Sequence, residues 1–357
     1  MEIYLESEER AAYALRSLYR KYGYKPYKMS KFESYDFYVR NKNFLLSDDI
    51  ITFTDKNGKL MALKPDVTLS IVKNSVGGEE IEKVYYNENV FRVSDESKAF
   101  KEIMQTGLEC IGKLDDYCVA EVLLLAKKSL ETLSPEYVLD VSHVGILSDV
   151  IEDTGIRGEG KQKLLSLVKE KNLHEVDEVF LRSGVSLDRA ETLKELIRTD
   201  GTPAEILPKL EKMFAGTATE KAVKKFAAVL SLIPQDRVRI DFSVLNDMRY
   251  YNGIVFQGFI SGMPSGVLSG GQYDLLMKKM GKKSGAIGFA VYPERLTRSA
   301  EKGLDADVLV LYDDSVSLKK VSDTVQAFIT EGKRVLAKKN IGSERIGKIF
   351  DIREKKE

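Results

Sequence analysis

The spacing of apolar residues divides the chain into stretches with different hydrophobic patterns. Near the start, Leu15, Leu18, Tyr19 and Tyr22 recur at helical spacing, and Gly23 ends the run. Short runs with the composition of strands follow, and a helix is predicted over about 115–133 between two of them. The predicted strands are residues 50–54, 60–63, 84–93, 102–111, 137–141, 238–242, 253–260 and 285–291. Because Asn57-Gly58 lies between the first two, these are expected to form a hairpin.

Between residues 151 and 232 the strand-like pattern disappears. A helical spacing of apolar residues, in a stretch rich in Leu, Lys and Glu, replaces it. A helical block inside a β-rich core predicts an inserted subdomain. Further on, a strand over 306–311, a helix over about 317–330 and a strand over 334–337 predict one β-α-β unit. We therefore expect an α+β protein with an antiparallel sheet flanked by helices. Its expected parts are a core over 1–150 and 233–302, a helical insertion over 151–232, and a small C-terminal α/β unit over 303–357.

Composition and charge exclude some classes of protein. The 357 residues are 43% hydrophobic and 31% charged, a balance typical of a globular protein with a core. The 55 Lys and Arg residues match 55 Asp and Glu residues, and this neutrality argues against a dedicated nucleic-acid binder. No apolar run approaches the roughly 18 residues that span a bilayer, and the first residues do not resemble a signal peptide. We expect a cytoplasmic protein that does not enter a membrane.

Cysteine and histidine are too scarce for several kinds of site. The two cysteines, Cys110 and Cys118, have no Cys-x-x-Cys spacing, which argues against a disulfide framework or a zinc ribbon. The two histidines, His143 and His174, are too few for a multi-histidine metal site, and each is expected to be a surface or structurally bonded residue. No metal and no cofactor are expected.

One predicted strand carries polar groups on a groove. Residues two apart on a strand share a face, so Gln105, Gly107 and Glu109 face one side while Met104 and Leu108 face the other. An isolated carboxylate in a central strand is unfavourable unless it is paired or bound to a ligand. Glu109 is therefore either a ligand contact or one half of a structural ion pair.

Three more segments combine polar residues with glycines or paired aromatics. Residues 63–68 leave the hairpin and enter a helix that Asp66 or Thr68 is able to cap. For the pair Tyr250-Tyr251, strand alternation allows one ring in the core and the other in a pocket, although such a pair taken alone is mostly core packing. Residues 269–274 and 285–291 carry glycines that let a ligand approach the backbone, and Arg295 follows early in a helix.

Together and in this order, these segments resemble the core of class II histidyl-tRNA synthetases, over roughly residues 5–300. Residues 85–112 look like motif 2 of that class, and 285–296 look like motif 3. Residues 63–68, 250–256 and 270–274 resemble the histidine-specific segments. The resemblance implies a class II synthetase-like fold with a pocket for histidine.

The resemblance also implies roles for the matching residues. Six would contact histidine: Asp66, Thr68, Gln105, Glu109, Tyr250 and Tyr251. Glu109 and Tyr251 (or Tyr250) would face the imidazole, and Asp66, Thr68 and Gln105 would hold the α-ammonium group. Arg92 matches the motif 2 arginine on the α-phosphate of ATP, and Arg295 matches the motif 3 arginine on the triphosphate.

The departures from the synthetase pattern concern catalysis and tRNA binding. The Arg-Gly-Leu-Asp run that precedes the tyrosine pair in synthetases reads Asn246-Asp247-Met248-Arg249 here. Asparagine supplies no cation against the charge that develops at the α-phosphate, so activation of the amino acid is expected to be lost. Arg92 and Arg295 would then be vestigial nucleotide contacts. A fragment of an anticodon-binding domain follows motif 3, so tRNA binding is not expected.

This pattern resembles the regulatory subunit of ATP phosphoribosyltransferase, a paralogue of the synthetases. The resemblance implies a non-catalytic subunit for the first step of histidine biosynthesis, with L-histidine as feedback effector. Its expected partners are a short-form catalytic subunit and a second copy of the chain, as a dimer. Two alternatives remain: a divergent histidyl-tRNA synthetase that activates histidine with ATP, and a paralogue that aminoacylates something other than tRNA.

Overall fold

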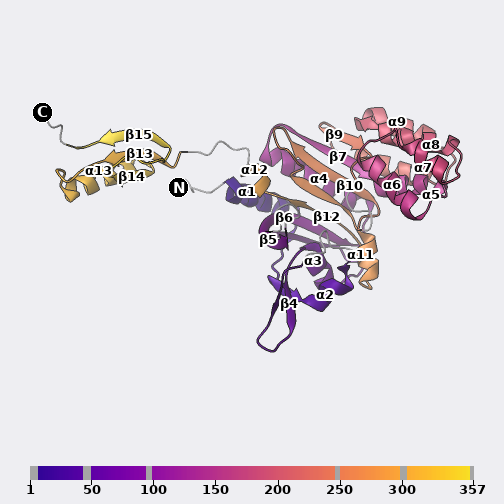
Figure 1. The fold of residues 1–357 in the computed structure, drawn as a ribbon, viewed down its shortest axis with the longest axis horizontal. Coiled ribbons are helices and arrows are strands. Elements are labelled where there is room, and N and C mark those ends of the chain that lie inside the picture. Colours follow the sequence, from indigo (N-terminus) through magenta and orange to yellow (C-terminus); the bar gives the residue numbers. More distant parts are fainter. Residues whose placement is uncertain (1–6, 43–49, 94–98, 246–249, 298–303, 354–357) are drawn as a thin grey trace. The chain divides into compact units, whose positions relative to one another are not determined.

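The computed structural model describes residues 7–42, 50–93, 99–245, 250–297 and 304–353, and Figure 1 shows its elements. The chain divides into two compact units, residues 1–298 and 299–357, each described by itself below. Sheets and helices both contribute to the first unit, which confirms the expected α+β class. None of the described helices is long and apolar enough to cross a membrane.

A nine-stranded sheet forms the centre of the first unit. Its order is β1-β5-β6-β12-β11-β10-β7-β9-β8. The bounds in that order are Lys25–Pro26, Glu82–Val93, Phe100–Gly112, Gly285–Val291, Leu268–Gln272, Ile254–Ile260, Tyr137–His143, Val238–Asp241 and Asp200–Gly201. Most neighbours are antiparallel, but β1 and β5 are parallel, as are β7 and β9. The sheet is therefore mixed, which corrects the prediction of an antiparallel sheet.

Two helices pack together on this sheet, α1 (Ser7–Lys21) and α4 (Asp116–Leu133). The carboxylate of Asp115 accepts a hydrogen bond from the backbone N–H of Cys118 (2.8 Å) and so caps α4. Leu123, Ala126 and Leu130 recur at helical spacing along α4 and are fully buried. This apolar side is why the helix predicted over 115–133 forms and packs there. The short helix α12 (Glu294–Thr297) packs against α1.

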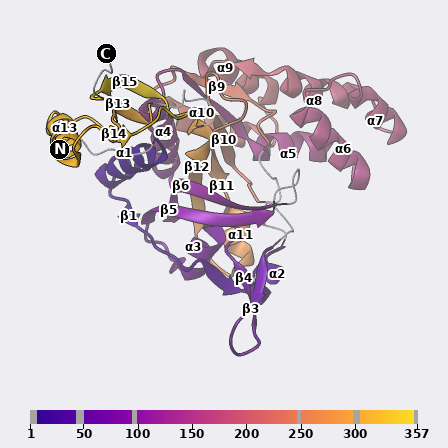
Figure 2. The same ribbon diagram turned by 60° about the vertical axis from the view of Figure 1, so that its left-hand side comes forward.

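A smaller layer lies beside the β5–β6 pair. It contains the sheet β2-β4-β3 and the helices α2, α3 and α11. The strands are β2 (Phe32–Ser34), β4 (Leu60–Leu63) and β3 (Thr52–Thr54). The helices are α2 (Tyr35–Arg40), α3 (Thr68–Asn74) and α11 (Asp274–Lys279). In both Figure 1 and Figure 2, α3 and the small sheet lie together below β5 and β6. Buried side chains of α3, α11 and the large sheet form one core cluster here, which holds the start of α3 against the sheet.

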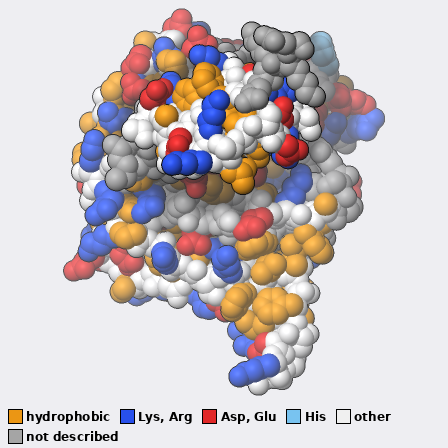
Figure 3. All heavy atoms as spheres, turned by 90° about the vertical axis from the view of Figure 1, so that its left-hand side faces the viewer, with side chains coloured by type: hydrophobic (Ala, Val, Ile, Leu, Met, Phe, Trp, Pro, Cys, Tyr) orange, Lys and Arg blue, Asp and Glu red, His pale blue; other side chains and the backbone are white. Residues whose placement is uncertain are grey.

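The predicted hairpin is confirmed, with Gly58 in the left-handed region at its turn (φ 80°). Figure 3 shows apolar side chains gathered on this protruding hairpin. Phe32 is 51% exposed, Phe53 is 40% exposed, and their ring centroids lie 5.9 Å apart.

Between β7 and β9 the chain forms the expected block of helices. These are α5 to α10, with bounds Val144–Asp153, Gly158–Lys169, Val176–Arg182, Asp188–Arg198, Pro203–Phe214 and Glu220–Ser231. The start of α9 is fixed by a capping box in which Thr202 and Glu205 satisfy each other's backbone groups. The short strand β8 interrupts the helices and pairs with β9.

The second unit is a parallel sheet of order β14-β13-β15 with one helix. β13 is Ala306–Leu311, α13 is Leu318–Thr330, β14 is Val335–Lys338 and β15 is Ile346–Asp351. The sequence predicted the first three elements and missed β15. Most of β15 is exposed and it carries Lys348 and Asp351, so its sequence has no buried apolar run.

Candidate functional site

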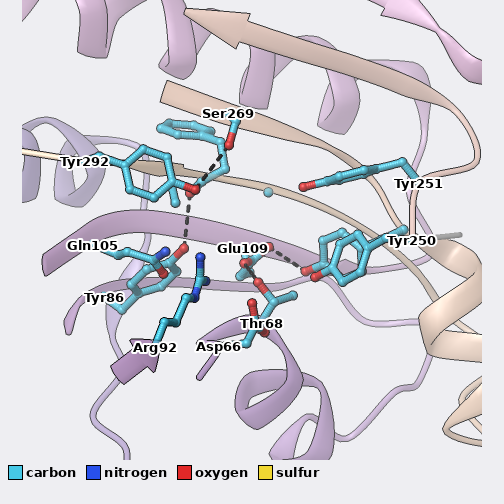
Figure 4. Close-up of a pocket in the computed structure, with 14 residues that line it drawn as sticks. Asp66, Thr68, Tyr86, Arg92, Gln105, Glu109, Tyr250, Tyr251, Ser269 and Tyr292 are labelled. Carbon is cyan, nitrogen blue, oxygen red and sulfur yellow. Dashed lines mark hydrogen bonds between the residues drawn. The ribbon is translucent and has the colours of Figure 1, made fainter. Parts of the chain in front are cut away.

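A pocket of about 110 Å³ opens between the large sheet and the start of α3. This volume is close to that of cavities that hold one aromatic ring, which is about 150 Å³. Figure 4 shows the fourteen lining residues. They are Asp66, Thr68, Tyr86, Arg92, Gln105, Glu109, Tyr250, Tyr251, Ser269, Tyr273, Gly288, Phe289, Ala290 and Tyr292. The structure thus brings all six expected histidine contacts, and also Arg92, into the lining of one cavity.

Glu109 is a buried member of this lining, with 2% of its surface exposed. Thr68 Oγ1 donates a hydrogen bond to its Oε1 (2.8 Å), and the hydroxyl of Tyr273 donates to its Oε2 (2.5 Å). In the part of the chain that the structure describes, hydroxyl groups rather than a cation hold this carboxyl group. The alternative that Glu109 is one half of a structural ion pair is therefore not supported among the described residues.

The environment of Glu109 favours its neutral form. Burial raises the pKa of this carboxyl group to about 8, although the hydrogen bonds from Tyr273 and Thr68 oppose the shift. The nearby charge of Asp66 adds to the increase in the pKa of Glu109. Near neutral pH without ligand, Glu109 therefore carries a proton for most of the time.

Gly288 makes room for the Glu109 side chain. It lies opposite Glu109 in the β6–β12 register. A Cβ atom at position 288 would lie 1.7 Å from Glu109 Oε2 and 2.5 Å from the backbone oxygen of Leu108. The first contact needs the carboxyl group to move, and the second needs the backbone to move, so only glycine fits here.

We expect Gly288→Ala to weaken ligand binding at this pocket more than tenfold and to destabilise the fold by about 1–3 kcal/mol, the usual range for overpacking. Calorimetric titration with histidine and thermal unfolding measure the two effects. Gly78→Ala is the matched control, because a Cβ atom there meets nothing within 4 Å. Equal histidine affinity in Gly288→Ala and the parent chain contradicts the proposed position of the ligand.

Asp66 has two roles. Its Oδ1 accepts a hydrogen bond from the backbone N–H of Leu69 (2.8 Å), which caps the first turn of α3 as one alternative predicted. The same residue lines the pocket, so the cap and the ligand site coincide. Burial raises the pKa of Asp66, while the hydrogen bond to Leu69 and the positive charge of Arg92 oppose that shift.

Tyr250 and Tyr251 both line the pocket, and Tyr250 is also a buried member of the core cluster beside α3, whereas Tyr251 is only partly buried. They precede β10, which begins at Ile254, and strand alternation does not apply to a stretch that is not a strand. Their ring centroids lie 4.7 Å apart in an edge-to-face arrangement, and Tyr250 also lies 5.5 Å from the ring of Tyr273.

The two arginines differ in position. Arg92 Nε donates to the backbone oxygen of Pro65 (2.8 Å), and its Nη2 is buried with no hydrogen-bond partner in the described structure. Arg295 is not among the residues that line the pocket. Its guanidinium lies 4.3 Å from the ring centre of Tyr292 and donates to the backbone oxygen of Gly266. Asn246, which carries the argument against catalysis, lies outside the described residues.

Sequence reasoning missed Tyr273, whose hydroxyl contacts Glu109 directly. Tyr273 lies in the segment 270–274 that resembles a histidine-specific motif, and this position could have pointed to it as a site residue. Tyr86 and Tyr292 also line the pocket and were not singled out. Of the two histidines, His143 caps α5 by accepting from the backbone N–H of Ile146 (3.3 Å), and burial lowers its pKa to about 4. Among the described residues, no group of His, Cys, Asp and Glu side chains is arranged to hold a metal ion.

Chemically, the pocket combines groups of opposite character around aromatic walls. The carboxyl groups of Glu109 and Asp66 offer acceptors, and the unpartnered nitrogen of Arg92 offers a donor to an anion. Tyrosine rings cover the sides. Such a set suits a small zwitterion whose side chain is a polar ring.

Comparison with known proteins is consistent with this geometry. Residues 4–296 match the protein family described as histidyl-tRNA synthetase. Curated relatives include the ATP phosphoribosyltransferase regulatory subunit of Caldanaerobacter subterraneus subsp. tengcongensis, 28% identical over 80% of this chain and 77% of that protein. The protein of the same name from Clostridium acetobutylicum is 26% identical over 90% of this chain and 83% of its own length.

Solved structures show the same fold. An ATP phosphoribosyltransferase regulatory subunit/histidyl-tRNA synthetase from Bacillus halodurans is 19% identical with a TM-score of 0.74, covering 100% of this chain and 97% of that one. A chain of the ATP phosphoribosyl transferase (HisG:HisZ) complex from Thermotoga maritima is 19% identical with a TM-score of 0.63, covering 82% and 98%. Both resemblances inferred from the sequence are confirmed, and the chain belongs to the histidyl-tRNA synthetase family.

Proposed function

We propose that this chain is a non-catalytic regulatory subunit of ATP phosphoribosyltransferase, and that L-histidine binds in the pocket around Glu109 as its feedback effector. The curated relatives named above are regulatory subunits of that enzyme, and they match most of the chain. The main support for the histidine site is Glu109, a buried carboxyl group that lines the cavity and has no counter-ion among the described residues.

Each part of histidine has a suitable group in the pocket. The imidazole has one donor and one acceptor nitrogen, and Glu109 with its tyrosine neighbours offers both kinds of group. Asp66 and Gln105 lie on the wall where an α-ammonium group finds acceptors, and both are more than nine-tenths buried. The unpartnered Nη2 of Arg92 suits an anionic group of the ligand.

The proposed partners are a short-form catalytic subunit and a second copy of this chain. The fold is shared with a chain of the HisG:HisZ complex, which is the basis for the first. For the second, the region of α1 and residues 32–35 carries exposed aromatic rings, with Tyr13 68% and Phe32 51% exposed. We also propose a cytoplasmic location, since the two cysteines are free and buried, as is usual in reducing compartments.

Mixing the chain with a short-form ATP phosphoribosyltransferase is expected to give a mixed complex on size exclusion, with activity that the catalytic subunit lacks alone. Histidine titrated into the chain is expected to give a saturable calorimetric signal, and histidine added to the complex is expected to change its activity. Bovine serum albumin in place of this chain is the control for non-specific activation.

The same preparation distinguishes the synthetase alternative. A regulatory subunit is expected to show no histidine-dependent pyrophosphate exchange, whereas a synthetase is expected to catalyse this exchange. Exchange at synthetase rates, or salt-sensitive tRNA binding without a mixed complex, contradicts the proposal.

A further inference from the structure

Two hydrogen bonds join Asn252 and Asp274, one from a backbone N–H and one between the side chains. The backbone N–H of Asp274 donates to Asn252 Oδ1 (2.8 Å), and Asn252 Nδ2 donates to Asp274 Oδ2 (3.3 Å). Asn252 directly follows Tyr251, and Asp274 directly follows Tyr273. Both tyrosines line the pocket, so the pair joins the two segments that carry them.

The pair is tied to the large sheet on both sides. Asp274 Oδ1 accepts from the backbone N–H of Ala286 (2.9 Å) in β12, the strand next to β6. The backbone N–H of Asn252 donates to the backbone oxygen of Gln272 (3.1 Å) at the end of β11. These bonds connect both segments to neighbouring strands of the large sheet.

Asn252 and Asp274 do not themselves line the pocket around Glu109. They line a second cavity of about 190 Å³, together with Lys225 and Phe226 of α10. A ligand in the pocket around Glu109 therefore meets Tyr251 and Tyr273 but not Asn252 or Asp274. Any effect of the pair on that ligand must act through the position of the two rings.

We propose that Asn252 and Asp274 are positioning residues that set the affinity of the pocket by fixing Tyr251 and Tyr273 in place. The inference rests on the proposed function only in naming histidine as the ligand. The hydroxyl of Tyr273 reaches Glu109 at 2.5 Å, so a small displacement of its segment breaks a direct contact at the centre of the site. Supporting groups of this kind commonly decide how well a binding site is organised before its ligand arrives.

The pattern of donors and acceptors permits a swap test. Asn252→Asp places a second carboxylate against Asp274 Oδ2, and Asp274→Asn places two amide donors against each other. The double variant Asn252→Asp/Asp274→Asn restores every bond, because the carboxylate at 252 accepts from both the backbone N–H and the amide at 274. The oxygen of that amide still accepts from Ala286.

Each single variant is expected to raise the dissociation constant for histidine about tenfold or more, measured by calorimetry below the melting temperature. The dissociation constant of the double variant is expected to lie within about twofold of that of the parent chain. Asn172→Asp is the matched control, because Asn172 also accepts from backbone N–H groups and donates to a carboxylate (Glu175, 2.7 Å), but in the helical insertion. Its affinity for histidine is expected to equal that of the parent chain.

A purely structural role predicts a different result: melting temperatures fall in the single variants and recover in the double variant, while the histidine affinity stays constant. That result overturns the inference. Asn252→Ser, which removes the amide without adding a charge, provides the same measurement if a charged single variant does not fold. A parent chain that does not bind histidine overturns the proposed function and this inference together, whereas normal parental binding with unaffected variants overturns the inference alone.

Discussion

Glu109→Gln is expected to weaken histidine binding by about ten- to a hundredfold and to leave the chain folded. A protonated imidazole beside Glu109 would favour the ionised carboxylate, so the variant loses one charge-assisted hydrogen bond in the complex. That loss accounts for roughly 1.5–3 kcal/mol, which corresponds to that range of dissociation constants. Glutamine keeps the size of the side chain, and the hydroxyl groups of Thr68 and Tyr273 are able to rotate toward its oxygen and nitrogen. The fold tolerates the change because it removes a buried group that has no counter-ion among the described residues.

Calorimetry gives the affinity and thermal unfolding gives the stability. Glu121→Gln is the matched control: Glu121 is also buried, but it forms an ion pair with Lys83 at 2.6 Å. Removing half of that pair is expected to lower the melting temperature without changing the histidine affinity. If Glu109→Gln behaves like Glu121→Gln, with early melting and normal binding, Glu109 is structural and the pocket lies elsewhere.

The stability of the ligand-free chain is expected to fall between about pH 4.5 and pH 8 because of Glu109. Its pKa is about 8 in the folded chain and near 4.5 when unfolded, so the folded state holds a proton that the unfolded state has released. A state that binds more protons is stabilised at low pH, and this contribution is lost as the pH rises toward 8. The full difference is of the order of 5 kcal/mol in the free energy of unfolding.

Urea unfolding of the parent chain and Glu109→Gln, at intervals from pH 5 to pH 9, measures this contribution. Burial also raises the pKa of Asp66 and Asp140 and lowers that of His143, but these groups are common to both chains. The effects of Asp140 and His143 largely cancel in the difference between the two curves, whereas Asp66 interacts with Glu109 and its contribution belongs to the difference. We expect the variant to gain stability relative to the parent as the pH rises, and parallel curves contradict the buried, neutral state of Glu109.

Much of the fold could be predicted because periodicity reports burial directly. The helix predicted over 115–133 and the strand over 285–291 match α4 and β12 to within one residue. The predictions failed where burial leaves no such signal. β11 contains Gly270 and Gly271, which have low strand propensity, and it is a strand because β10 and β12 pair with it on both sides.

The candidate site was predictable in part for a similar reason. Alternation along β6 is enough to place Gln105 and Glu109 on one face. The contact from Tyr273 to Glu109 joins residues 164 positions apart and depends on the order of β6, β12 and β11, which no local pattern contains. The mutual bonding of Asn252 and Asp274 depends on the same strand order.

The order of strands in the large sheet also has a consequence during synthesis on the ribosome. β6 pairs with β12 on one side, and residues 113–284 separate them along the chain. At roughly 5–20 residues per second, translation of that stretch takes about 10–30 seconds. During this interval the edge of β6 that later pairs with β12 has no partner strand, and an unpaired edge is a template for aggregation. A nascent chain of this protein is therefore expected to expose a long-lived binding site for chaperones, which closes only when β12, near the end of the first unit, emerges.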